Sequence, residues 1–159
     1  MAPRAKLARF MKKLRFMLPK NILVPTDFSE CATHALEYAS ELARKLDATI
    51  HLVHCFGPRS PEMNLVVTES MLEALRTGAV QGMERLTAAR PDVRFGHLAV
   101  MRGDPRDGIL EVAESLKPDL IVIGTHGRRG FARLVLGSVA EHVLRRAACP
   151  VMTLRGVES

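Results

Sequence analysis

The 159-residue sequence has no tryptophan, one tyrosine and only three cysteines, and these scarcities exclude several classes of protein. Cys31, Cys55 and Cys149 are far apart and odd in number, so a disulfide framework is not indicated, and the absence of a C-x2-C pair argues against structural zinc. We expect three packed, reduced thiols, which indicates the cytoplasm. The sequence also lacks the run of about 18 apolar residues that a membrane-spanning helix requires.

Basic residues are concentrated at the amino terminus. Residues 1–20 carry seven lysines and arginines and no acid. Subtracting these seven from the 23 basic side chains leaves 16 against 17 acids, a formal net charge of −1 for residues 21–159. A basic face for DNA or RNA is therefore not indicated, and the scarce aromatic residues offer few platforms for stacking bases.

Residues 4–18 have the pattern of a basic amphipathic helix. Lysines and arginines surround a stripe of apolar residues at helical spacing, namely Leu7, Phe10, Met11, Leu14, Met17 and Leu18. Three interpretations stay open: a loose amino terminus, a helix that docks on its own domain or a partner, or a segment lying on an anionic membrane surface. We therefore separate a basic amphipathic extension, residues 1–18, from a domain of residues 19–159.

Short apolar runs alternate with helical patterns in this domain. The expected strands are residues 21–25, 48–56, 93–101, 119–124 and 151–154. The expected helices are residues 31–46, 70–89, 105–116 and 137–147, the first with Ser29 as its N-cap. This alternation predicts an α/β, Rossmann-like three-layer sandwich: a five-stranded parallel sheet with helices on both faces. Ligands of such sheets bind beyond the carboxyl ends of the strands.

The segment after the fourth expected strand is the strongest candidate for a binding site. It leaves the strand at Gly124, turns at Gly127 and enters the next helix at Gly137 and Ser138. Glycines let backbone amides approach a ligand closely, and the N–H groups and positive dipole at a helix start favour an anion. Ser138 could donate its hydroxyl to a phosphate or cap the helix. Glycines alone are weak evidence, because tight turns also require them.

The spacing of these glycines is more specific. Gly124-x2-Gly127-x9-Gly137-Ser138 has the G-x2-G-x9-G-[ST] form of nucleotide-binding members of the universal stress protein family, which this chain resembles. Further matches are Val24-Pro25-Thr26-Asp27-Phe28-Ser29, His54, Gly103-x-Pro105, Ser138-Val139-Ala140-Glu141 and Cys149-Pro150-Val151. The resemblance extends over residues 20–156 and implies an adenine nucleotide alpha hydrolase-like fold.

The resemblance also implies a site for ATP, with ADP and AMP as alternatives. The nucleoside end would be lined by Pro25, Thr26 and Asp27. The backbone around Cys55 would meet adenine, and Met101 and Gly103 would border the sugar. The phosphates would be held by Gly124, Gly127, Gly137, Ser138 and Val139. Mg²⁺ or Mn²⁺ would sit mainly on phosphate oxygens, because one carboxylate is too few for a protein cage.

Several of these residues have simpler interpretations. Asp27 could cap the first helix instead of holding a ribose. Arg128 and Arg129, which are neighbours in the glycine-rich segment, could be solvated rather than paired with phosphate. His126 has no carboxylate close in sequence to orient it as a base. His51 and His54 are three residues apart on an expected strand, so they point to opposite faces and cannot chelate one ion.

The sequence lacks the common catalytic signatures. It contains no GxxxxGK[ST], GxSxG or HExxH motif, and no lysine lies in the glycine loop. We therefore predict an ATP-binding regulatory or stress-response module, in which a bound nucleotide orders the loops and alters binding to a regulatory protein partner. The alternatives are a scaffold of the same fold that binds no nucleotide, and a slow ATPase or phosphotransferase using His126.

The last expected strand, residues 151–154, suggests an oligomer. It is short and ends an open parallel sheet, whose unpaired edge needs covering. The family resemblance implies a homodimer joined there, in which a two-fold axis satisfies both edges at once.

Overall fold

The computed structural model describes residues 18–57, 68–125 and 136–155; the expected extension before Leu18 lies outside these ranges. The strands are β1 (Asn21–Pro25), β2 (Thr49–Phe56), β3 (Phe95–Arg102), β4 (Leu120–Gly124) and β5 (Val151–Leu154). The helices are α2 (Glu30–Leu46), α3 (Glu69–Ala88), α4 (Pro105–Leu116) and α5 (Ser138–Arg146). Among them, no helix combines the length and the apolar character needed to cross a membrane.

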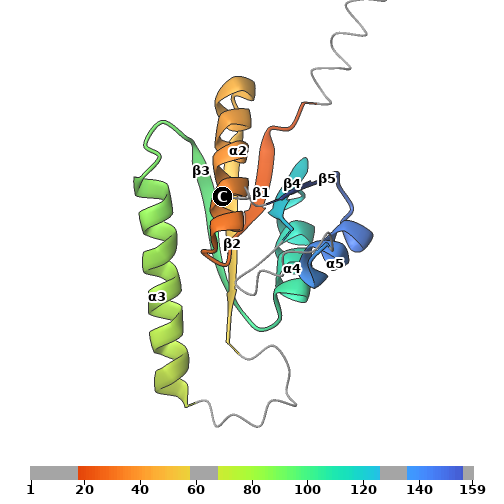
Figure 1. Ribbon diagram of the computed structural model, residues 1–159. Coiled ribbons are helices and arrows are strands. Elements are labelled where there is room, and N and C mark those ends of the chain that lie inside the picture. Colours follow the sequence, from red (N-terminus) through yellow and green to blue (C-terminus); the bar gives the residue numbers. More distant parts are fainter. Residues whose placement is uncertain (1–17, 58–67, 126–135, 156–159) are drawn as a thin grey trace, which may run out of the picture.

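All strands are parallel and lie in the order β3-β2-β1-β4-β5, with a layer of helices on each face (Figure 1). The predicted three-layer α/β fold is therefore confirmed. Element boundaries differ from expectation by one residue or less except at the start of β3, which begins at Phe95 rather than at residue 93. The amide of Val93 donates to the carbonyl of Arg90 at 3.1 Å, so these residues form a turn before the strand begins.

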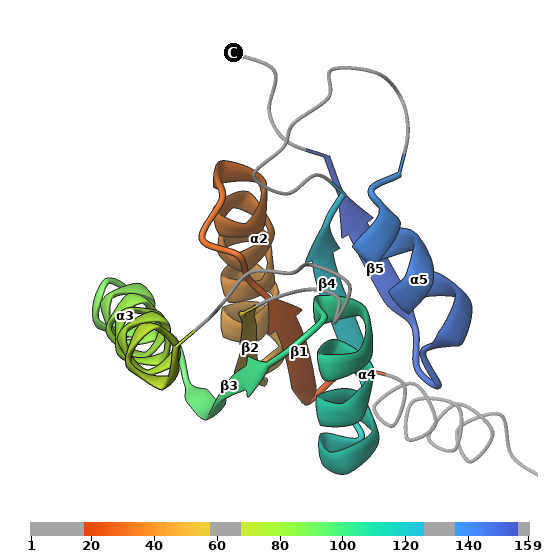
Figure 2. The ribbon, with the colours of Figure 1, turned by 90° about the horizontal axis from the view of Figure 1, so that it is seen from below.

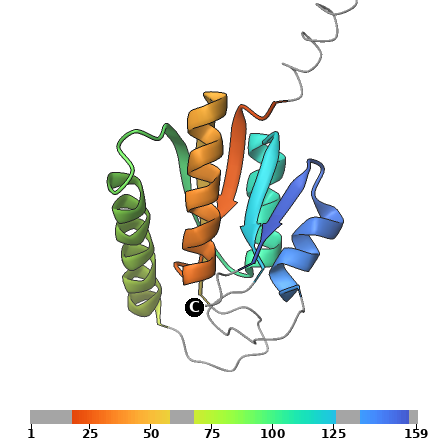
Figure 3. The ribbon, with the colours of Figure 1, turned by 45° about the horizontal axis from the view of Figure 1, so that its top comes forward.

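The two helical layers enclose two separate cores. Helices α2 and α3 cover one face, and α4 and α5 cover the other (Figures 2 and 3). Alternate residues of β1 enter different cores: Ile22 and Val24 pack beneath α2 and α3, whereas Leu23 packs beneath α4 and α5. The strands are apolar on both faces because both faces are covered.

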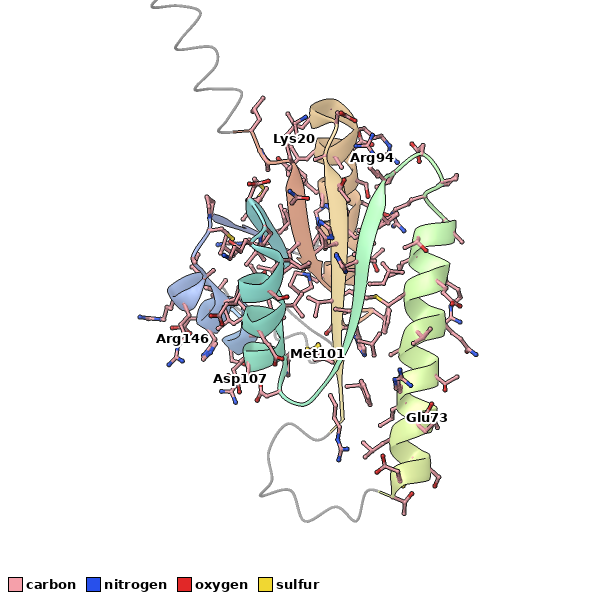
Figure 4. All side chains as sticks on the ribbon, turned by 180° about the vertical axis from the view of Figure 1, so that it is seen from behind. Lys20, Glu73, Arg94, Met101, Asp107 and Arg146 are labelled. Carbon is pink, nitrogen blue, oxygen red and sulfur yellow. The ribbon has the colours of Figure 1, made fainter. Side chains whose placement is uncertain are left out.

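The order of the strands creates the crevice that this fold offers to ligands. From β1 the chain continues to β2 on one side, whereas from β4 it continues to β5 on the other. The connections after these two neighbouring strands therefore diverge, which opens a crevice at their carboxyl ends. In Figure 4 this end of the sheet is marked by Met101, and the opposite end by Lys20 and Arg94.

His51 lies in β2 with both ring nitrogens engaged. Its Nδ1 accepts the amide N–H of His97 at 3.0 Å, and its Nε2 lies 3.2 Å from Oδ1 of Asn21, to which it donates. This arrangement requires the neutral imidazole, because a proton on Nδ1 would face the N–H of His97. Burial, with a smaller contribution from the charge of His97, lowers the pKa of His51.

We expect His51 to make the fold sensitive to acid. Since its pKa is lowered in the folded state, the stability it contributes is present above its unfolded pKa of about 6.5 and is lost as the pH falls. The free energy of unfolding, measured by urea titration, should decline from pH 7 to pH 5 in the wild type and decline less in His51→Gln. Parallel curves for the two proteins would contradict the assignment.

Candidate functional site

The structure describes all but one of the residues that the sequence assigns to a nucleotide site, and they lie at the carboxyl edge of the sheet. Thr26 and Asp27 follow Pro25 at the end of β1, Cys55 and Met101 pair near the ends of β2 and β3, and Gly124 ends β4. Gly103 follows β3, while Gly137, Ser138 and Val139 begin α5. Gly127 lies outside the described residues, as do His126, Arg128 and Arg129.

The loop after β1 is held by its own polar side chains. The hydroxyl of Thr26 accepts the amide of Phe28 at 3.1 Å, and Oδ1 of Asp27 accepts the amide of Ser29 at 3.0 Å. Ser29 is the N-cap of α2, accepting the amide of Ala32 at 3.2 Å, as predicted. The alternative that Asp27 caps this helix is therefore wrong: its carboxylate positions the residue that does.

The side chains of Phe28 and His54 hold this loop in place. His54 donates from Nδ1 to the carbonyl of Thr26 at 2.8 Å, and its ring lies 4.4 Å from the ring of Phe28. Phe28 has a left-handed backbone, with φ of 62°, which is uncommon for a large residue. Its ring fills a notch in α3 at Gly82, where an added Cβ would lie 2.7 Å from it. Sequence analysis missed this contact, although a glycine inside a helical pattern was its signal.

The region expected to meet adenine and ribose lies between β2, β3 and α4. Helix α4 comes close to Cys55, because a Cβ on Gly108 would lie 2.7 Å from its Sγ. Burial raises the pKa of Cys55, with smaller contributions from the charges of Asp104 and Glu111, and the resulting pKa is about 11. The thiol therefore stays protonated at neutral pH and is unsuited to act as a nucleophile.

Gly103 makes the turn between β3 and α4. Its φ of 123° suits glycine, and its amide donates to the carbonyl of Phe56 at 2.9 Å. Asp104 then caps α4, with Oδ1 accepting the amide of Arg106 at 2.8 Å, and Pro105 is the first helical residue. The sequence predicted this start of the helix from the same residues.

A hydrogen bond joins the two ends of the glycine-rich segment. The amide of Gly137 donates to the carbonyl of Thr125 at 2.8 Å, which brings the start of α5 beside the end of β4. Gly137 is the N-cap of α5, and within the described residues no side chain caps it. The suggestion that Ser138 caps the helix is therefore wrong, because Ser138 is its first residue.

This arrangement decides which amides are available to a ligand. The first N–H groups of an α-helix have no partner within the helix. Because the N–H of Gly137 is already bonded to Thr125, the donors that helix geometry leaves at this end are those of Ser138, Val139 and Ala140. Three N–H groups at the positive end of a helix dipole suit an anion such as phosphate.

Gly124 has a structural duty that is independent of any ligand. A Cβ at this position would lie 2.8 Å from Sγ and 2.9 Å from the carbonyl oxygen of Cys31. The glycine therefore allows the end of β4 to contact the first turn of α2. The first glycine of the motif is thus explained by packing, whether or not it also approaches a phosphate.

The described residues offer no ready metal cage. Across residues 18–57, 68–125 and 136–155, no group of three or more His, Cys, Asp or Glu side chains is placed to hold an ion. The carboxylate of Asp104 instead accepts a hydrogen bond from its own helix and two from the side chain of Arg106. The two Arg106 nitrogens, Nε and Nη2, lie 3.0 and 2.7 Å from its oxygens.

Comparisons with known proteins agree on one family. The family model described as "Universal stress protein family" matches residues 19–155. Universal stress protein MJ0531 of Methanocaldococcus jannaschii is 33% identical over 143 residues, which are 87% of this chain and 83% of that protein. The solved structure of MJ0577, from the same organism, has a TM-score of 0.78 at 27% identity and covers 89% of this chain and 99% of its own.

A more distant structure shares the fold alone. A universal stress protein family protein from Arabidopsis thaliana, solved with AMP bound, has a TM-score of 0.59 at 22% identity. The match covers 87% of this chain and 93% of that one.

The contact between Gly124 and Cys31 predicts a stability effect. Gly124→Ala should lower the free energy of unfolding by about 1–3 kcal/mol, because the new methyl group meets backbone that has little room to move. The control is Gly78→Ala in α3, where an added Cβ meets nothing within 4 Å; it should raise stability by about 0.5–1 kcal/mol. Urea titration measures both, and an undiminished stability of Gly124→Ala would refute the packing role.

Proposed function

The chain belongs to the universal stress protein family, and on this basis we propose that it is a cytoplasmic ATP-binding regulatory module. The proposed ligand is an adenine nucleotide: ATP, with ADP and AMP as the alternatives. Its phosphates would meet the first turn of α5, and its nucleoside would extend toward the ends of β1, β2 and β3. The cytoplasm suits the three separated cysteines, which are thiols packed into the fold.

The observation that carries this proposal is the start of α5. The amides of Ser138, Val139 and Ala140 have no helical partners, and the Thr125–Gly137 bond holds them beside the end of β4. That position borders the crevice where the strand order reverses. The proposed anion site would therefore border the proposed ligand crevice, which is the combination that a nucleotide requires.

The nucleoside end offers a second, weaker support. Thr26 and Asp27 are held in place by bonds to the following amides, so little ordering is needed when a ligand arrives. Cys55 and Met101 are partly buried neighbours that provide an apolar surface for a base. The AMP complex of a protein with the same fold supports the choice of an adenine nucleotide.

The described residues fit a divalent ion held by phosphate better than one held by protein. Mg²⁺ keeps several water ligands and is commonly bound by one or two carboxylates together with phosphate oxygens. Asp27 is the carboxylate that the site offers for this purpose or for a ribose hydroxyl. The ion would neutralise phosphate charge that the amides only partly balance.

Regulation, rather than rapid catalysis, suits these residues best. The Cys55 thiol is protonated at neutral pH, and the described part of the site contains no metal cluster. A nucleotide bound by amides from several loops would order those loops and so change the surface that a protein partner meets. A slow ATPase is the second candidate, supported only by the proposed phosphate site itself.

The α5 amides can be tested with a single proline. Ser138→Pro removes one N–H at the first helical position, where proline is well tolerated, and Gly137 already has the extended backbone (φ −60°, ψ 146°) that proline requires before it. Binding of ATP-Mg²⁺, measured by titration calorimetry, should weaken roughly tenfold to a hundredfold, because a hydrogen bond to a charged group is worth about 1.5–3 kcal/mol.

Ser138→Ala is the matched control, since it keeps the amide and removes only the hydroxyl. Its affinity should lie between those of the wild type and Ser138→Pro. If a folded Ser138→Pro bound ATP-Mg²⁺ as tightly as the wild type, the phosphates would not be bound by the α5 amides. A folded wild type that binds no adenine nucleotide would favour the scaffold alternative.

We also propose a homodimer joined along β5. This four-residue edge strand is half-buried along its whole length, and an exposed apolar side chain lies on each side of it. Tyr38 is one helical turn after His34, whose ring contacts the carbonyl of Arg155 just beyond β5. Leu144 lies on the side of α5 opposite His142, which faces Asp107 of α4. Both therefore project toward the β5 edge.

The dimer predicts that charge at these flanks separates the protomers. Wild type should be dimeric by light scattering at micromolar concentration, and Tyr38→Glu combined with Leu144→Glu should be monomeric. Loss of an interface anchor weakens the free energy of association by about 2 kcal/mol or more, which corresponds to at least about 30-fold weaker association. Leu75→Glu, at a similarly exposed leucine of α3, should stay dimeric. A monomeric wild type, or a monomeric Leu75→Glu, would contradict the interface.

A further inference from the structure

The opposite edge of the sheet is longer than the β5 edge and differently built. β3 has eight residues, and among the described strands it pairs only with β2. Its sequence contains no proline and no acid, and its only lysine or arginine is the last residue, Arg102. Edge strands are usually protected from further pairing by charges, prolines or bulges. Here the pairing is irregular only near the start, and Leu98–Arg102 pair regularly with β2.

The hydrogen bonds of β3 show which of its backbone groups point outward. The amides of His97 and Gly103 both donate toward β2, to Nδ1 of His51 at 3.0 Å and to the carbonyl of Phe56 at 2.9 Å. Backbone groups alternate in direction along a strand, so the N–H and C=O of Leu98, Val100 and Arg102 point away from the sheet. These residues offer three donors and three acceptors to an incoming strand.

Helix α3 runs alongside this edge and forms a groove with it. It is the outermost helix on the β3 side in every ribbon view (Figures 1, 2 and 3). A hollow of about 230 Å³ lies between them; its apolar lining is Phe56, Leu72 and Val100, and its charged lining is Glu69, Glu73, Arg76 and Arg102. A second hollow of about 430 Å³ is lined by residues of α3 alone, among them Val80, and the side chains of Leu98 and Val80 are exposed.

The position of α3 also limits what can occupy the groove. If β3 paired with its counterpart in a second copy, a two-fold axis would run normal to the sheet and place both α3 helices on the same face. Each helix would then lie beside the edge that the other copy must approach (Figure 2), so both helices would have to fit on one face of the junction. A single extended segment has no such helix. It can lie in the plane of the sheet, with α3 covering the new junction.

The charged lining is two glutamates and two arginines, and of these Arg102 lies at the end of the strand that an added segment would extend. Arg76 lies 3.6 Å from Glu73, which Figure 4 labels on the half of α3 nearest the end of β3. For Arg102, no carboxylate within the described ranges comes within ion-pair distance. An arginine at the open end of an edge strand is well suited to a carboxylate on an added peptide.

We propose that the groove between β3 and α3 binds an extended peptide of a partner protein, which adds a sixth strand to the sheet. The peptide bonds to the outward groups of Leu98, Val100 and Arg102, inserts an apolar side chain beside Phe56 and Leu72, and places a carboxylate at Arg102. The site lies outside the proposed nucleotide crevice, and the proposal does not depend on nucleotide binding.

The test uses full-length protein without nucleotide and a phage-displayed library of random twelve-residue peptides as the probe. Peptides selected on the wild type are synthesised and their affinities measured. We expect Val100→Pro to weaken binding at least tenfold, because it removes an outward N–H without breaking the β2–β3 ladder. Val100→Thr keeps the N–H and the side-chain shape and should change binding less than threefold.

Two further readouts keep the test independent of the proline variant. Arg102→Glu, an exposed substitution that leaves the core intact, should weaken the selected peptides at least tenfold. Amide hydrogen exchange should show new protection at Val100 and Arg102 on peptide binding, whereas Ala99 and Met101 already donate toward β2.

Three outcomes would overturn the proposal. The first is a selection that enriches no peptide for the wild type, and the second is peptides that bind Val100→Pro and Arg102→Glu as tightly as the wild type. The third concerns a second copy: if the Tyr38→Glu, Leu144→Glu protein stays dimeric and adding Val100→Pro dissociates it, the groove is an interface between copies of this chain.

Discussion

The candidate site depends on the pairing of β1 with β4, which joins segments about a hundred residues apart in sequence. Oδ2 of Asp119 accepts the amides of Lys20 and Asn21 at 2.9 and 2.8 Å, and the amide of Asp119 donates to the carbonyl of Asn21 at 2.8 Å. Hydrogen bonds to a carboxylate are strong, so this clamp sets the register of the two strands. The same register fixes how the loops after β1 and β4 meet at the far end of the sheet.

At that far end, two glycines are required for different physical reasons. Gly124 is needed because α2 lies too close for a side chain, and Gly103 because the chain turns through a positive φ. Gly137 has an ordinary extended backbone, so strain does not require a glycine there. The nucleotide proposal supplies a reason for this glycine, which is the close approach of a phosphate to its backbone.

The sequence predicted the layers and the order of elements, because these follow from apolar periodicity and from a capping residue such as Ser29. It could not predict contacts between residues distant in the chain. The notch of Gly82 around Phe28 and the engagement of Gly137 by Thr125 depend on how elements pack, which periodicity does not encode. Asp27 was misjudged as a possible cap for the same reason: two adjacent polar residues compete, and geometry decides between them.

The two edges of the sheet present different surfaces because the helices cover them differently. At β5 the strand is short and exposed apolar side chains flank it on both faces, which suits a symmetric partner that buries both flanks together. At β3 the strand is long and α3 lies alongside it, which suits a slender segment better than a second copy of the domain. Since Gly103 directly continues β3 into the candidate site, an added strand at Arg102 would be one residue from the loop that borders the proposed sugar position. Binding at that edge and at the crevice would therefore share one stretch of backbone, which gives a nucleotide a short physical route to a partner.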